Sequence, residues 1–147
     1  MDYKLLCAQL KALTEDVENV ISNLSNASAL LWQELADINW AGFYKMEGGI
    51  LVLYPFQGKP ACTKIAVGQG VCGTAVAENR TQLVPDVHQF PGHIACDCAS
   101  NSEIVVPIHV NGEIWGVLDI DSPSFSRFDE EDQKGLENFV KILETVL

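Results

Sequence analysis

Residues 103–120 read EIVVPIHVNGEIWGVLDI, and this stretch decides the fold. Two apolar runs, 103–110 and 113–120, flank Asn111-Gly112, the strongest short-range signal for a β-hairpin. Because the two strands run antiparallel away from that turn, they favour an antiparallel sheet. The hairpin therefore predicts that such a sheet forms the centre of the domain.

The rest of the chain supplies further strands and helices. Runs rich in aromatic and β-branched residues predict strands at 40–46, 50–56, 62–67 and 81–85. Apolar residues at three- and four-residue spacings predict helices at 5–13, 17–35, 71–78 and 129–146. The face of the first helix is expected to comprise Leu5, Leu6, Leu10 and Leu13, and Thr14 is expected to cap the second helix. The order predicts one α+β domain over residues 1–147, with helices packed on a central antiparallel sheet.

Charge and hydropathy exclude several classes of partner. The 147 residues carry 20 acidic and 9 basic side chains, a formal net charge of −11. Such a surface repels phosphate backbones and anionic lipids, so we expect neither nucleic acid nor membrane as a partner. The N-terminus lacks the basic and apolar regions of a signal peptide, and no apolar run is long enough to span a membrane. We therefore expect a cytoplasmic protein whose thiols are kept reduced.

The cysteines are the first candidates for chemistry. Their odd number argues against a fully paired disulfide framework, and Cys7 is read as a small buried hydrophobic residue. Cys72 lies near the start of the predicted helix 71–78, where a helix N-terminus favours the reactive thiolate. Cys96 lies in the long loop 86–102, a kind of segment that is usually functional. The five cysteines are Cys7, Cys62, Cys72, Cys96 and Cys98.

Acidic and aromatic residues gather beside that loop. Asp119 and Asp121 are two apart on a strand and share a face, and the hairpin brings Glu103 close to Asp121. Three carboxylates are therefore expected to converge, although Asp121 followed by Ser-Pro also fits ordinary turn chemistry. Trp40 and Tyr44 are four apart and share a strand face, where they form either a binding wall or part of the core.

A zinc site is the alternative use of the cysteines. His93, Cys96 and Cys98, with Cys62 and Cys72, supply enough ligands. The Cys-x-Cys pair lacks the usual two-residue gap, however, and no second paired set exists. We therefore predict no metal and no cofactor.

Five blocks of sequence resemble a known family. They are Asn39-Trp-Ala-Gly-Phe-Tyr44, Gly70-Val-Cys-Gly73, Pro91-Gly-His-Ile-Ala-Cys-Asp97, Ser102-Glu-Ile-Val105 and Gly116-Val-Leu-Asp-Ile-Asp-Ser122. Together they are similar to the free methionine-(R)-sulfoxide reductases, which are stand-alone GAF-domain enzymes. The resemblance covers nearly the whole chain and implies a single GAF-like domain. Its specific part is Gly-His-Ile-Ala-Cys-Asp, because other GAF domains share the fold without that block.

The resemblance implies a role for each matched residue. Cys96 is the attacking thiol, Cys62 the principal resolving thiol, and Cys72 a third redox cysteine. Free methionine (R)-sulfoxide is the substrate and thioredoxin the reductant, and a homodimer is possible. The substrate-site residues are Glu103, Asp119 and Asp121 as carboxylates and Trp40 and Tyr44 as an aromatic wall.

Further expectations come from the long loop. Because the loop lacks arginine, backbone N–H groups around Ile94 and Ala95 are expected to receive the substrate carboxylate. The chain departs from the family at Cys98, where a small residue is usual, so a further thiol can compete for oxidised Cys96. The alternative function is a GAF module that binds a small regulatory ligand without turnover.

Overall fold

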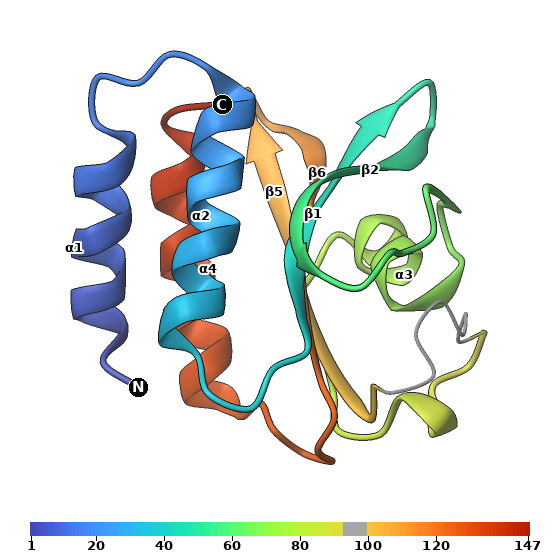
Figure 1. Cartoon of the computed structure of the whole chain (residues 1–147). Helices are drawn as coiled ribbons and strands as arrows, with labels where there is room; N and C mark the ends of the chain where they lie inside the picture. The colour runs from blue at the N-terminus through green and yellow to red at the C-terminus, as the bar shows by residue number, and fades with distance from the viewer. Residues whose placement is uncertain (93–99) are drawn as a thin grey trace.

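The computed structural model of the chain describes residues 1–92 and 100–147. A six-stranded antiparallel sheet, in the order β3-β2-β1-β6-β5-β4, runs through this part of the chain (Figure 1). Its strands are β1 (Trp40–Glu47), β2 (Ile50–Gly58), β3 (Lys64–Ala66), β4 (Gln82–Val84), β5 (Ser102–Val110) and β6 (Glu113–Ser122). The helices are α1 (Tyr3–Thr14), α2 (Val20–Glu34), α3 (Gly70–Glu78) and α4 (Glu130–Glu144), with a 3-10 turn η1 (Val87–Gln89). The predicted α+β fold is confirmed.

Helices cover the two faces of the sheet unequally. Helices α1, α2 and α4 lie on one side and α3 on the other (Figure 1). Successive residues of β5 and β6 point to opposite faces of the sheet, so the central hairpin supplies apolar side chains to both faces. Ile104 and Leu118 belong to the core under α2 and α4, whereas Val105 and Val117 belong to a second core under α3. The second core is where the candidate site forms.

The predicted hairpin is present. Asn111 and Gly112 form its turn, with φ angles of 55° and 79°. Both values are positive, as a type I′ hairpin turn requires, and Asn and Gly are the residues that adopt them at low cost. The turn joins β5 to β6, which form the longest ladder of the sheet.

The boundary between the first two helices differs from the prediction. Thr14 is the last residue of α1, and its hydroxyl donates a hydrogen bond to the Leu10 carbonyl oxygen at 2.9 Å. The chain then turns through Asp16, whose φ is 59°, before α2 begins at Val20. Asn19 is the N-cap, since its Oδ1 accepts from the Ser22 N–H at 3.0 Å. The predicted cap at Thr14 is therefore wrong. Thr14 and Asn19 are both residue types suited to capping and lie five residues apart, and the apolar periodicity of the helix does not distinguish between them.

The apolar face predicted for the first helix is also partly wrong. Leu6 and Leu10 are fully buried, but Leu5 and Leu13 are 55% and 41% exposed. The buried residues are four apart, so they form one stripe toward the core, and the other two lie beside it on the solvent side. None of the helices in residues 1–92 and 100–147 combines the length and apolar character needed to cross a membrane.

Candidate functional site

The carboxylates are brought together by the register of the central hairpin. Glu103 lies opposite Asp121, and Val105 lies opposite Asp119, so all three acidic residues share the face toward α3. This register depends on a shift between Ile108 and His109. Counting residue by residue back from the turn would place Glu103 opposite Ile120, with the carboxylates on opposite faces. The expected convergence of Glu103, Asp119 and Asp121 is confirmed.

Burial changes the ionisation of these carboxyls. Glu103 and Asp119 are only 8% and 6% exposed. Burial raises the pKa of Glu103 well above its usual range, and the charges of Asp119 and Asp121 raise it further. Burial also raises the pKa of Asp119, but hydrogen bonding with Glu103, Asp121 and Cys72 opposes that change. Of these two residues, Glu103 therefore holds its proton more firmly.

Two aromatic residues of β1 form a wall beside the carboxylates. Trp40 pairs with Asp121 and Tyr44 with Val117, so both rings lie on the carboxylate face. Their centroids are 5.9 Å apart, and Trp40 also stacks on Phe56 of β2 at 5.1 Å. Trp40 and Tyr44 are both buried. They are thus core residues and pocket walls at once, and both interpretations drawn from the sequence apply.

The same two residues hold the connection between β2 and β3. Trp40 Nε1 donates to the Lys59 carbonyl oxygen at 3.1 Å. The Tyr44 hydroxyl donates to the Cys62 carbonyl oxygen at 2.9 Å. Burial raises the pKa of Tyr44, which keeps the hydroxyl protonated and able to donate. Cys62 was predicted to lie in a strand, but it lies two residues before β3. Its backbone carbonyl is hydrogen-bonded to Tyr44 of the aromatic wall.

Cys72 contributes a sulfur atom from the first turn of α3. Its Sγ and one oxygen each of Glu103 and Asp119 all lie within 4.8 Å of one another. Burial raises the pKa of this thiol well above its ordinary value, and the nearby carboxylates raise it further. The predicted helix-stabilised thiolate at Cys72 is therefore wrong, because loss of hydration and like charge outweigh the helix N-terminus. Among the described cysteines, Cys7 and Cys72 carry free thiols, whereas Cys62 has a partner.

These side chains line one pocket. Its walls also include Gln69, Gly70 and Val71 at the start of α3, which were not among the predicted site residues although they adjoin Cys72. Gly70 has a φ of 61°, a conformation that favours glycine. The lining residues named from sequence are Trp40, Tyr44, Cys72, Glu103, Asp119 and Asp121, and the additional ones are Pro60, Ala61, Ile65, Gln69, Gly70, Val71 and Ser100.

Several predicted site residues lie outside the described residues. They are Ile94, Ala95 and Cys96, together with Cys98 and the His93 of the zinc alternative. In the part of the chain that the structure describes, the potential metal-ligating group is Cys72, Glu103 and Asp119, which shares only Cys72 with that alternative. The described residues therefore place around one pocket a carboxyl group with a strongly raised pKa, two further acidic side chains, an aromatic wall and a buried thiol.

Comparison with known proteins identifies close relatives. The model of the GAF domain family matches residues 12–147. Over 145 residues the chain is 57% identical to the free methionine-R-sulfoxide reductase of Escherichia coli, covering 99% of this chain and 88% of that protein. The reduced form of fRMsr of Staphylococcus aureus is 57% identical, with a TM-score of 0.97 and coverage of 99% and 95%. The free methionine-R-sulfoxide reductase from Neisseria meningitidis in complex with its substrate is 42% identical, with a TM-score of 0.95 and coverage of 98% and 87%.

Proposed function

Because this chain belongs to the free methionine-(R)-sulfoxide reductases of the GAF domain family, which are oxidoreductases, we propose that Cys96 attacks the substrate sulfoxide and that Cys62 and thioredoxin complete the cycle. The observation that carries this proposal is the cluster of three carboxyl groups beside Trp40 and Tyr44 in the lining of one pocket. Such a pocket suits a small amphipathic substrate with one cationic group and one apolar methyl group.

The proposed reaction moves one oxygen atom and two electrons. The Cys96 thiolate attacks the sulfoxide sulfur, the oxygen passes to the Cys96 sulfur, and methionine leaves, so the sulfoxide is reduced and Cys96 becomes a sulfenic acid. The Cys62 thiol then displaces that oxygen as water and forms a Cys62–Cys96 disulfide. A thioredoxin dithiol reduces this disulfide and is itself oxidised. We propose the cytosol as the site of the reaction, because thiols are kept reduced there.

Glu103 is the proposed proton donor. Protonation of the sulfoxide oxygen makes the sulfur more electrophilic, and the donor must lie in the pocket. The position of Glu103, which lies opposite Asp121 and lines the pocket, supports this role. Its raised pKa keeps the proton available near neutral pH.

The remaining pocket walls are assigned to the other substrate groups. Asp119 and Asp121 receive the ammonium group as charge-assisted hydrogen-bond acceptors. Trp40 and Tyr44 enclose the S-methyl group. The substrate carboxylate is assigned to backbone N–H groups of Ile94 and Ala95. These two residues lie outside the described residues, so this assignment stays a prediction.

Cys62 is favoured over Cys72 as the principal resolving thiol. The Tyr44 hydroxyl holds the Cys62 backbone beside the pocket. Cys72 is only 4% exposed, and its raised pKa keeps it a neutral thiol, which is a poor nucleophile. Cys72 is therefore assigned mainly to the pocket wall, with a redox role only when Cys62 is absent.

The test is a coupled turnover assay. Purified protein, thioredoxin, thioredoxin reductase and free methionine (R)-sulfoxide should consume NADPH, and Cys96→Ser should abolish both turnover and single-turnover methionine release. Cys7→Ser is the matched control and should keep full activity. Saturable binding of the sulfoxide without turnover would instead support a GAF sensor module.

The carboxylate cluster also predicts substrate specificity. N-acetylated methionine (R)-sulfoxide has lost the ammonium charge and leaves buried carboxylates unpaired, at a cost of about 2–5 kcal/mol. We expect kcat/KM for this compound to be lower by at least roughly 30-fold. Equal values for the free and acetylated compounds would refute the assigned ammonium site.

We further propose that two copies of the chain pair through α1 and α2. Leu5, Leu13, Ile21 and Trp32 of these helices are all more than a third exposed. Exposed apolar side chains on two helices that pack together are candidates for an interaction site. Sedimentation equilibrium should show a dimer for the wild type and a monomer for Leu13→Glu/Ile21→Glu, and a monomeric wild type would contradict the pairing.

A further inference from the structure

We propose that the reduced protein binds one Zn²⁺ ion between Cys72 Sγ, a Glu103 carboxylate oxygen and an Asp119 carboxylate oxygen. This metal site goes beyond the proposed reduction of methionine sulfoxide, which uses no metal. The three ligand atoms come from α3, β5 and β6 and lie within 4.8 Å of one another.

The spacing of the three atoms fits a tetrahedral ion. Zinc binds thiolate at about 2.3 Å and carboxylate oxygen at about 2.0–2.2 Å, which places neighbouring ligand atoms roughly 3–4 Å apart. Separations of no more than 4.8 Å need only small side-chain rotations to reach those values. All three residues line the pocket, so a water molecule from the pocket would complete the coordination, as in zinc sites that keep an exchangeable ligand.

A second observation points to a missing cation. Asp119 is 6% exposed, and its Oδ1 is a fully buried oxygen with no hydrogen-bond partner within residues 1–92 and 100–147. Buried polar atoms almost always have partners, so an unsatisfied carboxylate oxygen needs an explanation. A cation held between Asp119 and its neighbours would satisfy that oxygen.

The donor set selects zinc over the common hard cations. Mg²⁺ and Ca²⁺ prefer six or more oxygen ligands, and neither favours sulfur. One thiolate with two carboxylates suits Zn²⁺, which accepts mixed sulfur and oxygen donors in a four-coordinate site. On binding, the protons of the Cys72 thiol and any protonated carboxyl leave to solvent.

Occupancy of this site has a consequence for the proposed substrate. The ion would lie where the substrate ammonium is assigned, against Asp119, and it would remove the proton of Glu103. Zinc should therefore inhibit the reductase reversibly and in competition with the sulfoxide. A chelator should restore activity.

Direct binding tests the site without relying on activity. Titration of the reduced protein with Zn²⁺ should show saturable binding of one ion, and Mg²⁺ should not compete. Cys72→Ser and Asp119→Asn should each weaken binding by at least about tenfold, as losses in the ligand environment do. Cys7→Ser, which removes the other free thiol among residues 1–92 and 100–147, is the matched control and should bind normally. Thermal unfolding of each variant checks that it is folded.

A second variant separates this site from the other thiols. Cys62→Ser/Cys96→Ser/Cys98→Ser keeps only Cys7 and Cys72, and it should still bind one Zn²⁺. When Co²⁺ replaces Zn²⁺ in this variant, it should give a thiolate charge-transfer band. The band should be absent when the Cys72→Ser substitution is added to the triple variant. The inference is overturned if no zinc binds, if the triple variant loses binding, or if Cys72→Ser leaves the affinity and the cobalt band unchanged. Because that triple variant lacks the proposed nucleophile, these outcomes are independent of whether the chain reduces methionine sulfoxide.

Discussion

At the scale of single residues, identical functional groups acquire different chemistry from their surroundings. In water, three carboxyls would all be ionised near neutral pH. In this pocket, burial and repulsion by its neighbours raise the pKa of Glu103 well above its usual range, whereas burial raises the pKa of Asp119 and hydrogen bonding partly offsets that rise. One cluster can then contain an acid and an anion at the same pH, which is the requirement for donating a proton while binding an ammonium group.

Glu103→Gln tests the acid directly. The substitution keeps the size of the side chain and removes the transferable proton, so we expect kcat to fall about 100-fold or more. Steady-state measurement of kcat and KM with a chelator present would detect this. Glu113→Gln, at an exposed position on the same hairpin, should leave both constants unchanged. A kcat for Glu103→Gln within twofold of the wild type would exclude Glu103 as the acid.

Tyr44→Phe separates the two proposed thiol steps. The ring stays in the wall, but the hydrogen bond to the Cys62 carbonyl oxygen is lost. We expect unchanged methionine release in a single turnover and disulfide formation slowed roughly tenfold, since one hydrogen bond contributes about 1–1.5 kcal/mol. Rapid-quench thiol trapping would follow both steps. Equal slowing of both steps would argue that Tyr44 acts on the substrate rather than on Cys62.

At the scale of elements, helix α4 has a well-defined start. The Asp129 side chain accepts from the Asp132 N–H at 2.9 Å, and the Asp132 side chain accepts from the Asp129 N–H at 3.0 Å. This reciprocal capping box satisfies two N–H groups that a helix leaves without partners. The backbone hydrogen bond from Asp132 lowers the pKa of Asp129 below its usual value of 3.8.

The capping box makes stability depend on acid pH. Because the folded-state pKa of Asp129 is lowered, its contribution is fully present above the ordinary value and is lost as pH falls through the folded-state value. Asp129→Ser keeps a capping oxygen that does not titrate. Urea unfolding of both proteins between neutral pH and about pH 2 should show the wild type losing stability relative to Asp129→Ser in acid. A constant difference across that range would contradict this prediction.

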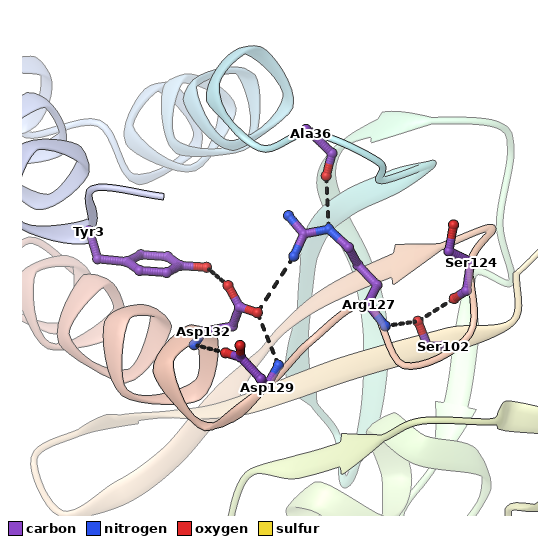
Figure 2. A network of polar contacts seen from close by, with 7 residues as sticks. All are labelled: Tyr3, Ala36, Ser102, Ser124, Arg127, Asp129 and Asp132. Atoms are coloured by element: carbon purple, nitrogen blue, oxygen red, sulfur yellow. Dashed lines mark hydrogen bonds and ion pairs between the residues drawn. The ribbon is translucent and has the colours of Figure 1, made fainter.

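At the scale of the whole molecule, one arginine joins elements that are distant in sequence. The Arg127 side chain donates from Nε to the Ala36 carbonyl oxygen at 2.9 Å and pairs with Asp132 at 3.5 Å (Figure 2). Its backbone N–H donates to Ser102 Oγ at 3.3 Å, at the start of β5. Asp132 in turn accepts from the Tyr3 hydroxyl of α1. The network thus ties α1, the end of α2 and α4 to the strand that carries Glu103.

Arg127→Ala should therefore destabilise the fold. We expect the free energy of unfolding to fall by about 1–3 kcal/mol, because the buried Asp132 carboxylate loses its ion pair with Arg127. The matched control is Arg80→Ala, since the side chains of the Arg80–Glu78 pair are 66% and 44% exposed. An exposed pair of this kind contributes at most about 1 kcal/mol. Equal effects in denaturant unfolding would show that the Arg127 network adds no stability beyond a surface contact.

Sequence by itself determined the features that depend on short-range physics. The Asn111-Gly112 turn, the apolar alternation of its strands and the helical periodicities act over a few residues, so they predicted the antiparallel sheet with its helices. The two-residue spacing of Asp119 and Asp121 also placed both on one face.

Tertiary structure decided what depends on packing between distant segments. The shift between Ile108 and His109 sets Glu103 opposite Asp121, and no short-range signal announces it. Burial between α3 and the sheet made Cys72 a neutral thiol, although its position near a helix start suggested the opposite. Both outcomes follow from the same physical cause: register and desolvation are set by all the elements packed around a residue, whereas sequence patterns report only its neighbours along the chain.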